Sequence, residues 1–379
     1  MTASSLSGVS CLVTGASGFV GRRIVQMLLE EEPELEELRV MDKNLSEDLL
    51  KTCQRFQDRT TVKTLQGDIR DTDFLHRCCQ GVSLVIHAAA IIDTVGKVRK
   101  DVVMSINVTG TEQLLEACLQ NNVPYFIFTS SIEVCGPNPQ GDPIVNGTEE
   151  TAYASKPGFC YGESKSLAEK KVLEANGQEL QNGGTLTTCS LRPVYVFGEG
   201  SQFLQIHLDQ ALLNGDVFHR TSRKEALVNP VYVGNVAWAH LLAARAMKDP
   251  EGTKKIAGNF YFLTDDTPHM SYSDLNHALG KELGLRVERK LAMPLPVLYI
   301  VASLMEMVGF VLRPFVRFVP PFTRHLLTIL NTPFTFTYRK LQSDAGYKPR
   351  YSWEEARQVT SDWMASVIPQ RRELLRKKK

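Results

Sequence analysis

Tyr161 and Lys165 lie four residues apart in the segment YGESKSLAEKK, residues 161–171. Apolar residues at helical spacing predict a helix here, and side chains at positions i and i+4 share one face of a helix. An ammonium beside a phenol favours the phenolate, which would make the tyrosine a general base. The spacing alone is weak support for chemistry, because such pairs also occur on solvated helix faces.

A glycine-rich segment near the start of the chain reads LVTGASGFVG, residues 12–21. It places Gly15, Gly18 and Gly21 after an apolar strand and before a predicted helix. The glycines allow a tight turn and a close approach of a pyrophosphate, which the helix N-terminus would bind. Asp42 ends the next predicted strand, where a carboxylate would accept hydrogen bonds from the adenosine ribose.

Asp42 also bears on the choice of cofactor. Its carboxylate would repel the 2′-phosphate of NADP and therefore favours NAD. NADP stays the alternative, because a cation near this position accommodates the 2′-phosphate and the sequence places Arg22, Arg23 and Lys43 nearby. Asp68, in GDI after the third predicted strand, is placed either to meet the adenine amino group or to serve as a turn carboxylate.

The elements that would position these residues alternate between apolar strands and helices. Strands are expected in VSCLVTG, ELRVMDK, VKTLQGDI, SLVIHAAA, PYFIFTSS and TLTTCSLRPVYVFG, with helices at 22–31, 104–121 and around Tyr161. The Pro/Gly-rich stretch 132–160 predicts a loop. This alternation predicts an α/β fold, a Rossmann-type doubly wound parallel sheet with a smaller C-terminal substrate region and a membrane-associating helical segment.

Four regions follow from this pattern along the chain. Residues 1–200 would form the NAD-binding domain with the catalytic residues, and 201–290 a substrate-binding region that partly returns to the sheet. Residues 291–325 would form the hydrophobic segment. Residues 326–379 would pack back on the body and end in a basic tail.

Composition excludes several classes of protein. The chain has 43 basic and 42 acidic residues and a net charge of +1, which gives no bulk attraction to nucleic acid. Its eight cysteines show no C-x-x-C spacing, so reduced thiols are expected rather than a disulfide framework or a zinc site. No cluster has metal-ligand spacing, and no metal is predicted. No signal peptide is evident, which places the body in a reducing compartment.

Seven motifs occur in the order found in extended short-chain dehydrogenases/reductases. They are the glycine turn, GDI, HAAA (87–90), NVTGT (107–111), TSSIEV (129–134), Y-x-x-x-K and LRP (191–193). Later segments narrow the resemblance, namely NPVYVGNVAWAH, FLTDDTPHMSY, VPPFTRH and YKPRYSWEEA. Across about residues 8–370 the chain resembles the vertebrate 3β-hydroxysteroid dehydrogenase/Δ5–Δ4 isomerase family.

The resemblance implies oxidation of the 3β-hydroxyl of a Δ5-steroid with NAD, then isomerisation to the Δ4-3-ketone, in steroid hormone biosynthesis. Ser131 would hold the substrate oxygen, Tyr161 would be the acid/base, and Lys165 would lower the pKa of Tyr161 and hold the nicotinamide ribose. Asn107 would order a water relay behind the lysine. The implied cofactor-binding residues are Gly15, Ser17, Gly18, Phe19, Val20, Gly21, Asp42, Asp68, Ile69, Ala88, Tyr161, Lys165 and Pro193.

Isomerisation requires a base that moves a proton from C4 to C6 and a hydrogen-bond donor on the ketone oxygen. Asp265 and Asp266 are the candidate bases and Tyr261 a candidate acid, although Tyr161 would also serve as the donor. The alternative is that TDDTPH forms only a strand end and turn. His87 is expected to be a structural histidine near the nicotinamide rather than a base.

Residues 291–312 are apolar apart from Glu306. The uninterrupted part, 297–312, would span roughly 24 Å at ~1.5 Å per residue, less than a ~30 Å hydrocarbon core. Glu306 at mid-membrane would cost about 3 kcal/mol. We therefore expect a helix lying in the membrane interface, with a buried core helix plus a substrate lid as the alternative.

The resemblance also implies a homodimer, membrane lipid as a partner, and location on endoplasmic reticulum and mitochondrial membranes, with the catalytic body on the cytosolic or an equivalent reducing side. One alternative function is a 3β-sterol dehydrogenase of sterol decarboxylation or bile-acid synthesis, without isomerisation. Another is a non-catalytic dinucleotide sensor, which would have no need of Ser131, Tyr161 and Lys165.

Overall fold

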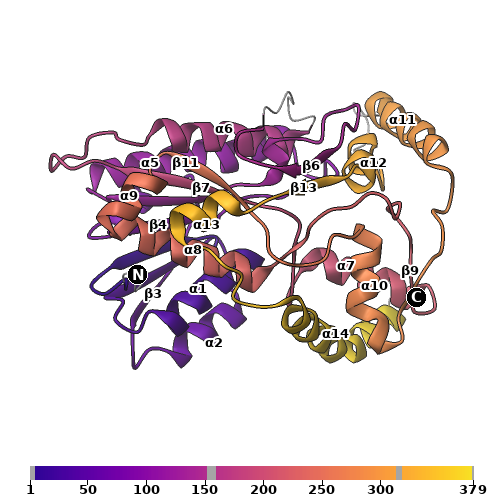
Figure 1. Cartoon of the computed structure of the whole chain (residues 1–379), viewed down its shortest axis with the longest axis horizontal. Coiled ribbons are helices and arrows are strands. Elements are labelled where there is room, and N and C mark those ends of the chain that lie inside the picture. The colour runs from indigo at the N-terminus through magenta and orange to yellow at the C-terminus, as the bar shows by residue number, and fades with distance from the viewer. Residues whose placement is uncertain (1–4, 152–158, 313–317, 378–379) are drawn as a thin grey trace.

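A seven-stranded parallel sheet forms the centre of the computed structural model, which describes residues 5–151, 159–312 and 318–377 (Figure 1). The strand order is β11-β7-β5-β4-β1-β2-β3. The chain builds β1 to β3 outward in one direction and then β4 to β11 in the other, so the order reverses between β1 and β4. In such folds ligands bind at the carboxyl ends of the strands at this reversal. The strands are β1 (Ser10–Thr14), β2 (Glu37–Asp42), β3 (Thr61–Gln66), β4 (Leu84–His87), β5 (Tyr125–Thr129), β7 (Thr187–Pro193) and β11 (Asn259–Leu263).

Helices cover both faces of this sheet, which confirms the predicted doubly wound fold (Figure 1). On one face lie α1 (Phe19–Glu31), α2 (Glu47–Arg55), α8 (Val233–Lys248), α9 (Pro250–Ile256) and α13 (Arg339–Ala345). On the other lie α3 (Thr72–Cys79), α5 (Gly110–Gln120) and α6 (Cys160–Glu174), whose apolar residues share one core cluster.

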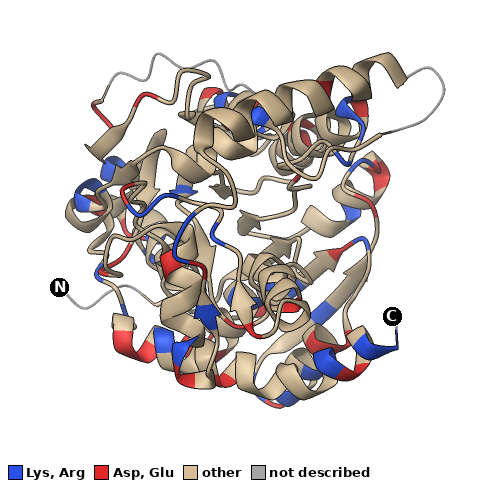
Figure 2. Ribbon diagram, turned by 90° about the vertical axis from the view of Figure 1, so that its right-hand side faces the viewer, with Lys and Arg blue, Asp and Glu red and all other residues tan. Residues whose placement is uncertain are grey.

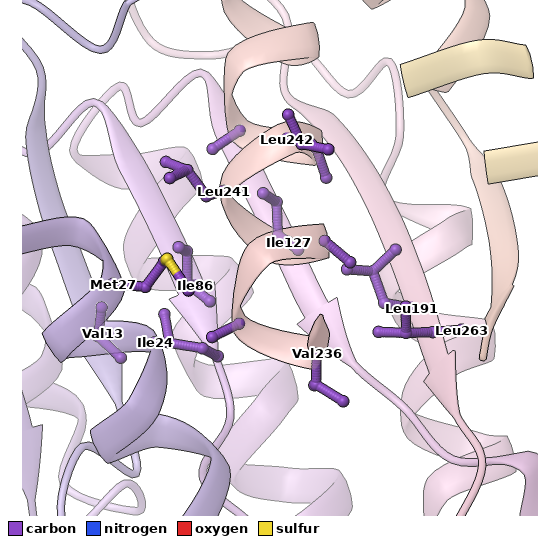
Figure 3. Close-up of a cluster of buried hydrophobic side chains, with 14 of the residues drawn as sticks. Val13, Ile24, Met27, Ile86, Ile127, Leu191, Val236, Leu241, Leu242 and Leu263 are labelled. Carbon is purple, nitrogen blue, oxygen red and sulfur yellow. The ribbon is translucent and has the colours of Figure 1, made fainter. Parts of the chain in front are cut away.

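Each face of the sheet packs against its helices in a separate hydrophobic core, and successive strand residues alternate between these two cores. On β1, Cys11 and Val13 pack toward α1 and α8, while Leu12 packs toward the opposite face. On β5, Ile127 and Phe128 divide in the same way. Figure 3 shows the core beneath α1 and α8, where strand and helix side chains interlock. Burial of each such side chain contributes about 1.5–3 kcal/mol, so both faces hold the strand ends firmly in place.

The predicted helix at 104–121 contains a π turn. α4 (Lys100–Met104) continues through a π-helical turn at Ser105–Thr109 into α5. Such turns contain one extra residue and are frequent at functional sites. Asn107 lies inside this turn and is buried.

The stretch predicted as a loop contains two elements in its described part. A 3₁₀ turn covers Ile132–Val134, and β6 (Ile144–Gly147) pairs in parallel with β13 (Phe334–Phe336). The prediction was wrong for β6, because its partner strand lies far along the chain and leaves no local pattern.

A second set of elements lies beside the sheet and is closed by α14 (Trp353–Arg376), which begins with a capping box formed by Ser352 and Glu355. Arg371 of α14 forms an ion pair with Asp209 of α7. The set comprises α7 (Gln202–Leu213), α10 (Tyr272–Gly280), the pair β8 (Val196–Phe197) and β10 (Val231–Tyr232), and the pair β9 (Val217–Phe218) and β12 (Arg286–Val287).

The apolar segment forms α11 (Leu295–Leu312), which lies on the outside of the molecule. Among the described residues it is the one helix that is long and apolar enough to cross a membrane. Ala302 is its single buried residue, so the alternative of a buried core helix is wrong. Figure 2 shows α11 along the top of the molecule, ending at the grey trace, with few charged residues.

Candidate active site

The glycine-rich turn between β1 and α1 leaves no room for larger residues. Gly15 has φ +70°, and a Cβ there would lie 2.6 Å from the Ala89 nitrogen. A Cβ on Gly21 would lie 2.0 Å from the Gly15 carbonyl oxygen. α1 has no side-chain cap at Gly18, so its first backbone N–H groups are available to an anion. The turn therefore fits the pyrophosphate of a dinucleotide.

Asp42 lies at the end of β2 beside this turn. Its carboxylate accepts hydrogen bonds from the backbone N–H groups of Ser17 at 3.0 Å and Asn44 at 3.2 Å. These two bonds hold the carboxylate at the carboxyl edge of the sheet, where an adenosine ribose would lie.

The cations that would accommodate a 2′-phosphate all have other partners. Arg22 pairs with Asp48 at 2.9 Å, and Lys43 pairs with Asp68 at 3.3 Å. Arg23 donates to the phenol of a tyrosine in the C-terminal segment at 2.6 Å. Because these cations are paired elsewhere, the Asp42 carboxylate makes the electrostatic potential negative where the ribose 2′-oxygen would lie.

Asp68 is held by a bidentate pair with Arg70, at 2.9 and 2.7 Å. Hydrogen bonding to Arg70 keeps the pKa of the Asp68 carboxyl well below its usual range. Its contact with an adenine amino group stays a prediction. The other predicted cofactor residues lie at the same edge, with Phe19 and Val20 at the start of α1, Ile69 against Gly110, Ala88 after β4 and Pro193 at the end of β7.

Ser131, Tyr161 and Lys165 come together at the carboxyl end of β5. Ser131 follows that strand, and its hydroxyl hydrogen-bonds the Tyr161 phenol. Tyr161 and Lys165 are both buried on the inner face of α6. The Lys165 ammonium donates to the Thr129 carbonyl at 2.7 Å and lies 4.0 Å from the Phe128 ring centroid. The prediction that one helix face presents the pair is confirmed.

The predicted electrostatic effect of Lys165 on Tyr161 was wrong for this arrangement. Burial and the nearby Glu133 carboxylate raise the pKa of Tyr161 instead of lowering it. Burial lowers the pKa of Lys165 to about 7, against the opposing effect of Glu169. The Lys165 ammonium bonds the Thr129 carbonyl, a partner that the sequence spacing could not indicate although it placed Lys165 on the correct helix face.

Asn107 links the π turn to the catalytic helix. Its side-chain amide donates to the Ile91 carbonyl at 3.0 Å and to the Ser164 hydroxyl at 2.9 Å, and accepts from the Ile91 N–H at 2.8 Å. These bonds fix α6 against the turn. The predicted role of Asn107 in a water relay stays a prediction.

His87 is held between two hydroxyl groups. The Thr111 hydroxyl donates to the Asn107 carbonyl at 2.7 Å, so it must accept from the ring Nε2–H at 2.9 Å. Nδ1 is therefore the acceptor from the Thr14 hydroxyl at 2.7 Å. Burial and the charge of Lys165 lower the His87 pKa to about 3. This is the environment of a neutral, structural histidine.

Glu133 is a site residue that sequence reasoning missed. It follows Ser131 by two residues, and its Oε2 is buried with no hydrogen-bond partner in the described part of the chain. Burial raises the pKa of Glu133 to about 7, and its charge acts on both Tyr161 and Tyr272. A glutamate within the apolar run IEV, directly after the serines, was the available signal.

Asp265, Asp266 and Tyr261 lie in a different set of contacts. Asp265 is buried and accepts from the Tyr232 N–H at 2.9 Å and the Asn235 amide at 2.8 Å. Asp266 accepts from a phenol of the C-terminal segment at 2.8 Å, and Tyr261 donates to a carboxylate of α13 at 3.1 Å.

The two aspartates line a cavity of about 490 Å³ whose described lining includes none of Ser131, Tyr161 and Lys165. The hydrogen bonds of Asp265 and Asp266 therefore do not join them to Ser131, Tyr161 or Lys165. Their predicted isomerase roles, and that of Tyr261, stay predictions.

All eight cysteines are free thiols. Across residues 5–151, 159–312 and 318–377, no group of histidine, cysteine and carboxylate side chains is arranged to hold a metal ion.

Comparisons with known proteins agree with this geometry. The model of the 3-beta hydroxysteroid dehydrogenase/isomerase family matches residues 12–295. The crystal structure of gox2253 is similar at 25% identity and TM-score 0.69, over 96% of this chain and 99% of that one.

Two further structures share the fold. MoeE5 in complex with UDP-glucuronic acid and NAD is 20% identical, with a TM-score of 0.69 over 94% of this chain and 99% of that one. DesIV, a dTDP-glucose 4,6-dehydratase from Streptomyces venezuelae with NAD bound, is 18% identical, with a TM-score of 0.69 over 96% and 98% of the two chains.

Proposed function

Because the chain belongs to the 3-beta hydroxysteroid dehydrogenase/isomerase family, we propose that it oxidises the 3β-hydroxyl of a Δ5-steroid and then moves the double bond into conjugation. One observation carries this proposal. The Tyr161 phenol, hydrogen-bonded to Ser131, lies at the end of β5 together with the Glu133 carboxyl, whose Oε2 is buried without a hydrogen-bond partner among the described residues. Alcohol oxidation requires the first group, and proton transfer at carbon requires the second.

NAD is the cofactor we propose, in preference to NADP. The glycine turn fits a pyrophosphate, and the fixed carboxylate of Asp42 with the paired state of Arg22 and Lys43 disfavours a 2′-phosphate. MoeE5 and DesIV, which share the fold, were solved with NAD. When bound, NAD supplies the hydride acceptor, and its positive ring favours the Tyr161 phenolate.

In the first step, Ser131 and Tyr161 hold the substrate oxygen, and the Tyr161 phenolate takes the hydroxyl proton as the hydride leaves C3. Tyr161 is then a neutral phenol that donates to the new ketone oxygen. Lys165, held by its hydrogen bond to the Thr129 carbonyl, would hold the nicotinamide ribose when the cofactor is bound.

In the second step, the Glu133 carboxylate takes the proton from C4 and the electrons move toward the ketone oxygen. Tyr161 and Ser131 stabilise the developing negative charge by hydrogen bonding. Protonated Glu133 then returns the proton at C6, so no net proton is gained or lost. A pKa of about 7 makes Glu133 a stronger base than an ordinary carboxylate and still an effective acid at neutral pH.

We also propose that α11 rests in one leaflet of a membrane, on the endoplasmic reticulum or on mitochondria, with the body on the cytosolic or an equivalent reducing side. Elements after α11 pack on elements before it, since β13 pairs with β6 and Phe334 donates to the Leu227 carbonyl at 2.9 Å. A single crossing would separate them. Glu306, the acidic residue of α11, pairs with Arg324 of α12 (Arg324–Asn331) at 2.8 Å.

The α11–α12 pair also lies beside the catalytic helix. The His325 ring of α12 stacks on Phe159, with centroids 4.8 Å apart, and Phe159 directly precedes α6. A lipid-soluble substrate would therefore leave the bilayer close to Tyr161. We further propose a homodimer through helices of the dinucleotide-binding region, which sedimentation of the purified protein would test.

Acidic substitutions on the exposed face of α11 should release the protein from lipid. Ile300 and Phe310 are 61% and 75% exposed. Burying each contributes about 1.5–3 kcal/mol, so the double change Ile300→Asp/Phe310→Asp should weaken binding to phosphatidylcholine vesicles by at least about tenfold in a flotation assay. Val359→Asp, at an exposed apolar residue of α14, is the matched control. Equal flotation of the double variant and wild type would contradict the interfacial helix.

A single assay tests the chemical proposal. Purified protein, NAD and pregnenolone are mixed, and NADH and the conjugated enone are followed together. Formation of both is the expected result. NADH without enone would favour the alternative 3β-sterol dehydrogenase, and no turnover of any sterol would favour a dinucleotide sensor.

A further inference from the structure

We infer that Arg192 is a positioning residue that holds together the two segments carrying the proposed catalytic groups. One segment, residues 131–135, follows β5 and contains Ser131 and Glu133. The other is α6, which contains Tyr161 and Lys165. The catalytic meaning of this inference rests on the proposed function, although the contacts of Arg192 can be tested without turnover.

The guanidinium of Arg192, near the end of β7, contacts both segments. Its Nε donates to the two carboxylate oxygens of Glu169 on α6 at 3.0 Å, and its Nη2 donates to one of them at 2.5 Å. Its Nη1 donates to the Cys135 sulfur at 3.3 Å. One side chain therefore joins α6 to the end of the 131–135 segment, and these contacts are called the Arg192 bridge.

On α6 the bridge is attached to the helix face that carries the catalytic pair. Glu169 follows Lys165 by four residues, as Lys165 follows Tyr161, so the three side chains lie along one face. Glu169 is 4% exposed and Arg192 8%. The Ser190 hydroxyl of β7 also donates to Glu169, at 2.6 Å. The bonds to Glu169 therefore fix the catalytic face of α6 against β7.

The 131–135 segment is held by β7 at both of its ends. Before it, the Ser130 N–H donates to the Leu191 carbonyl at 2.7 Å. After the turn, Arg192 contacts Cys135, which is 3% exposed. The Cys135 N–H also donates to the Ile132 carbonyl at 2.8 Å, so the segment is compact and moves as one unit. Neighbouring residues of one strand therefore set the positions of both catalytic segments.

A guanidinium suits this bridge better than an ammonium. It is planar and has five donors in fixed directions, whereas a lysine presents a compact point charge. The Arg192 Cζ also lies 3.6 Å from the ring centroid of Phe260 on β11, so a neighbouring strand supports it. Because a displacement of about 1 Å in a catalytic group can cost about 10²-fold in rate, loss of the bridge should lower turnover.

The test removes the bridge without leaving a buried charge. Arg192→Met/Glu169→Gln neutralises both partners, because loss of one alone would leave the other charged and buried. For NADH formation from pregnenolone, kcat per folded molecule should fall by about 10²-fold, while the KM for NAD changes by less than about fivefold. In hydrogen–deuterium exchange, peptides covering 131–135 and α6 should exchange faster than in wild type, whereas those covering β1 and α1 should not.

The matched control is a second buried ion pair, Arg245 with Glu32 at 2.6 Å, where α8 meets the C-terminal end of α1. Arg245→Met/Glu32→Gln should lower thermal stability without changing kcat per folded molecule. Arg192→Lys separates ion pairing from bridging, since a lysine can pair with Glu169 but cannot donate to Cys135 in the same geometry. It should stay folded and still lose at least about tenfold in kcat.

A kcat within about threefold of wild type in the folded double variant would overturn the inference, because the bridge would then not position the catalytic groups. Unchanged exchange in 131–135 and α6, or an equal fall in kcat in the control pair, would also overturn it. Should the double variant not fold, as judged by circular dichroism, Arg192→Lys is judged by the same criteria. If the wild-type protein does not turn over pregnenolone, the proposed function fails, and hydrogen exchange alone decides whether the bridge holds the two segments.

Discussion

Glu133→Gln should abolish isomerisation while the dehydrogenase reaction continues. The amide keeps the shape of the side chain but cannot take a proton from C4. Loss of a general base typically costs 10²–10⁴-fold, so enone formation from a Δ5-3-ketosteroid should fall by about that factor. Because Tyr161 and Ser131 are unchanged, NADH formation from pregnenolone should stay within about tenfold of wild type.

The matched control for this variant is Glu149→Gln. Glu149 is another carboxyl whose pKa is raised by burial, but it accepts a hydrogen bond from the Phe262 N–H at 2.8 Å and lies outside the triad. It should retain both reactions. If Glu133→Gln isomerised normally and Asp265→Asn alone lost isomerisation in a folded protein, the base would be Asp265.

The pH dependence supplies an independent check on the same group. Only the carboxylate form of Glu133 can accept the C4 proton, and burial raises its pKa to about 7. Isomerisation by the wild-type protein should therefore rise as pH passes through about 7 and level off above it. An ordinary carboxylate base would show this rise below pH 5 instead.

Tyr161→Phe should remove dehydrogenation, with the largest effect of any single substitution in the chain. The ring remains packed on α6, but neither proton removal nor donation to the ketone oxygen is possible. We expect NADH formation to fall by about 10³-fold or more, within the range for general acid–base catalysis combined with a lost oxyanion donor. Isomerisation should also slow, since Tyr161 stabilises charge on the same oxygen.

Tyr125→Phe is the control for this change, because that phenol lies at the opposite end of β5. Thermal melting of both variants would show whether the fold is kept. Dehydrogenation within threefold of wild type in a folded Tyr161→Phe protein would show that the phenol is not required. The alternative of a non-catalytic dinucleotide sensor would then have to be considered again.

Local spacing made part of this site predictable. The glycine turn, Asp42 and the Tyr161–Lys165 pair depend on residues a few positions apart, so periodicity and turn chemistry indicate them directly. The parallel sheet followed from the alternation of elements for the same reason.

The remaining features depend on contacts between distant segments. The pairing of β6 with β13 joins residues near 145 and 335, and the bond from Lys165 to Thr129 joins α6 to β5. Glu133 becomes notable only when its Oε2 is seen to be buried without a partner. No pattern along the chain records these facts, because they arise from packing.

The ion pair between Glu306 and Arg324 has a consequence for topology. Because this ion pair joins α11 to α12, α11 enters the membrane from one side only. The segments before and after α11 then stay in one folded body on that side. Reporter tags fused at the two ends of the chain would then face the same compartment. Because the proposed orientation places the body on the cytosolic side, added protease should reach both tags on sealed organelles.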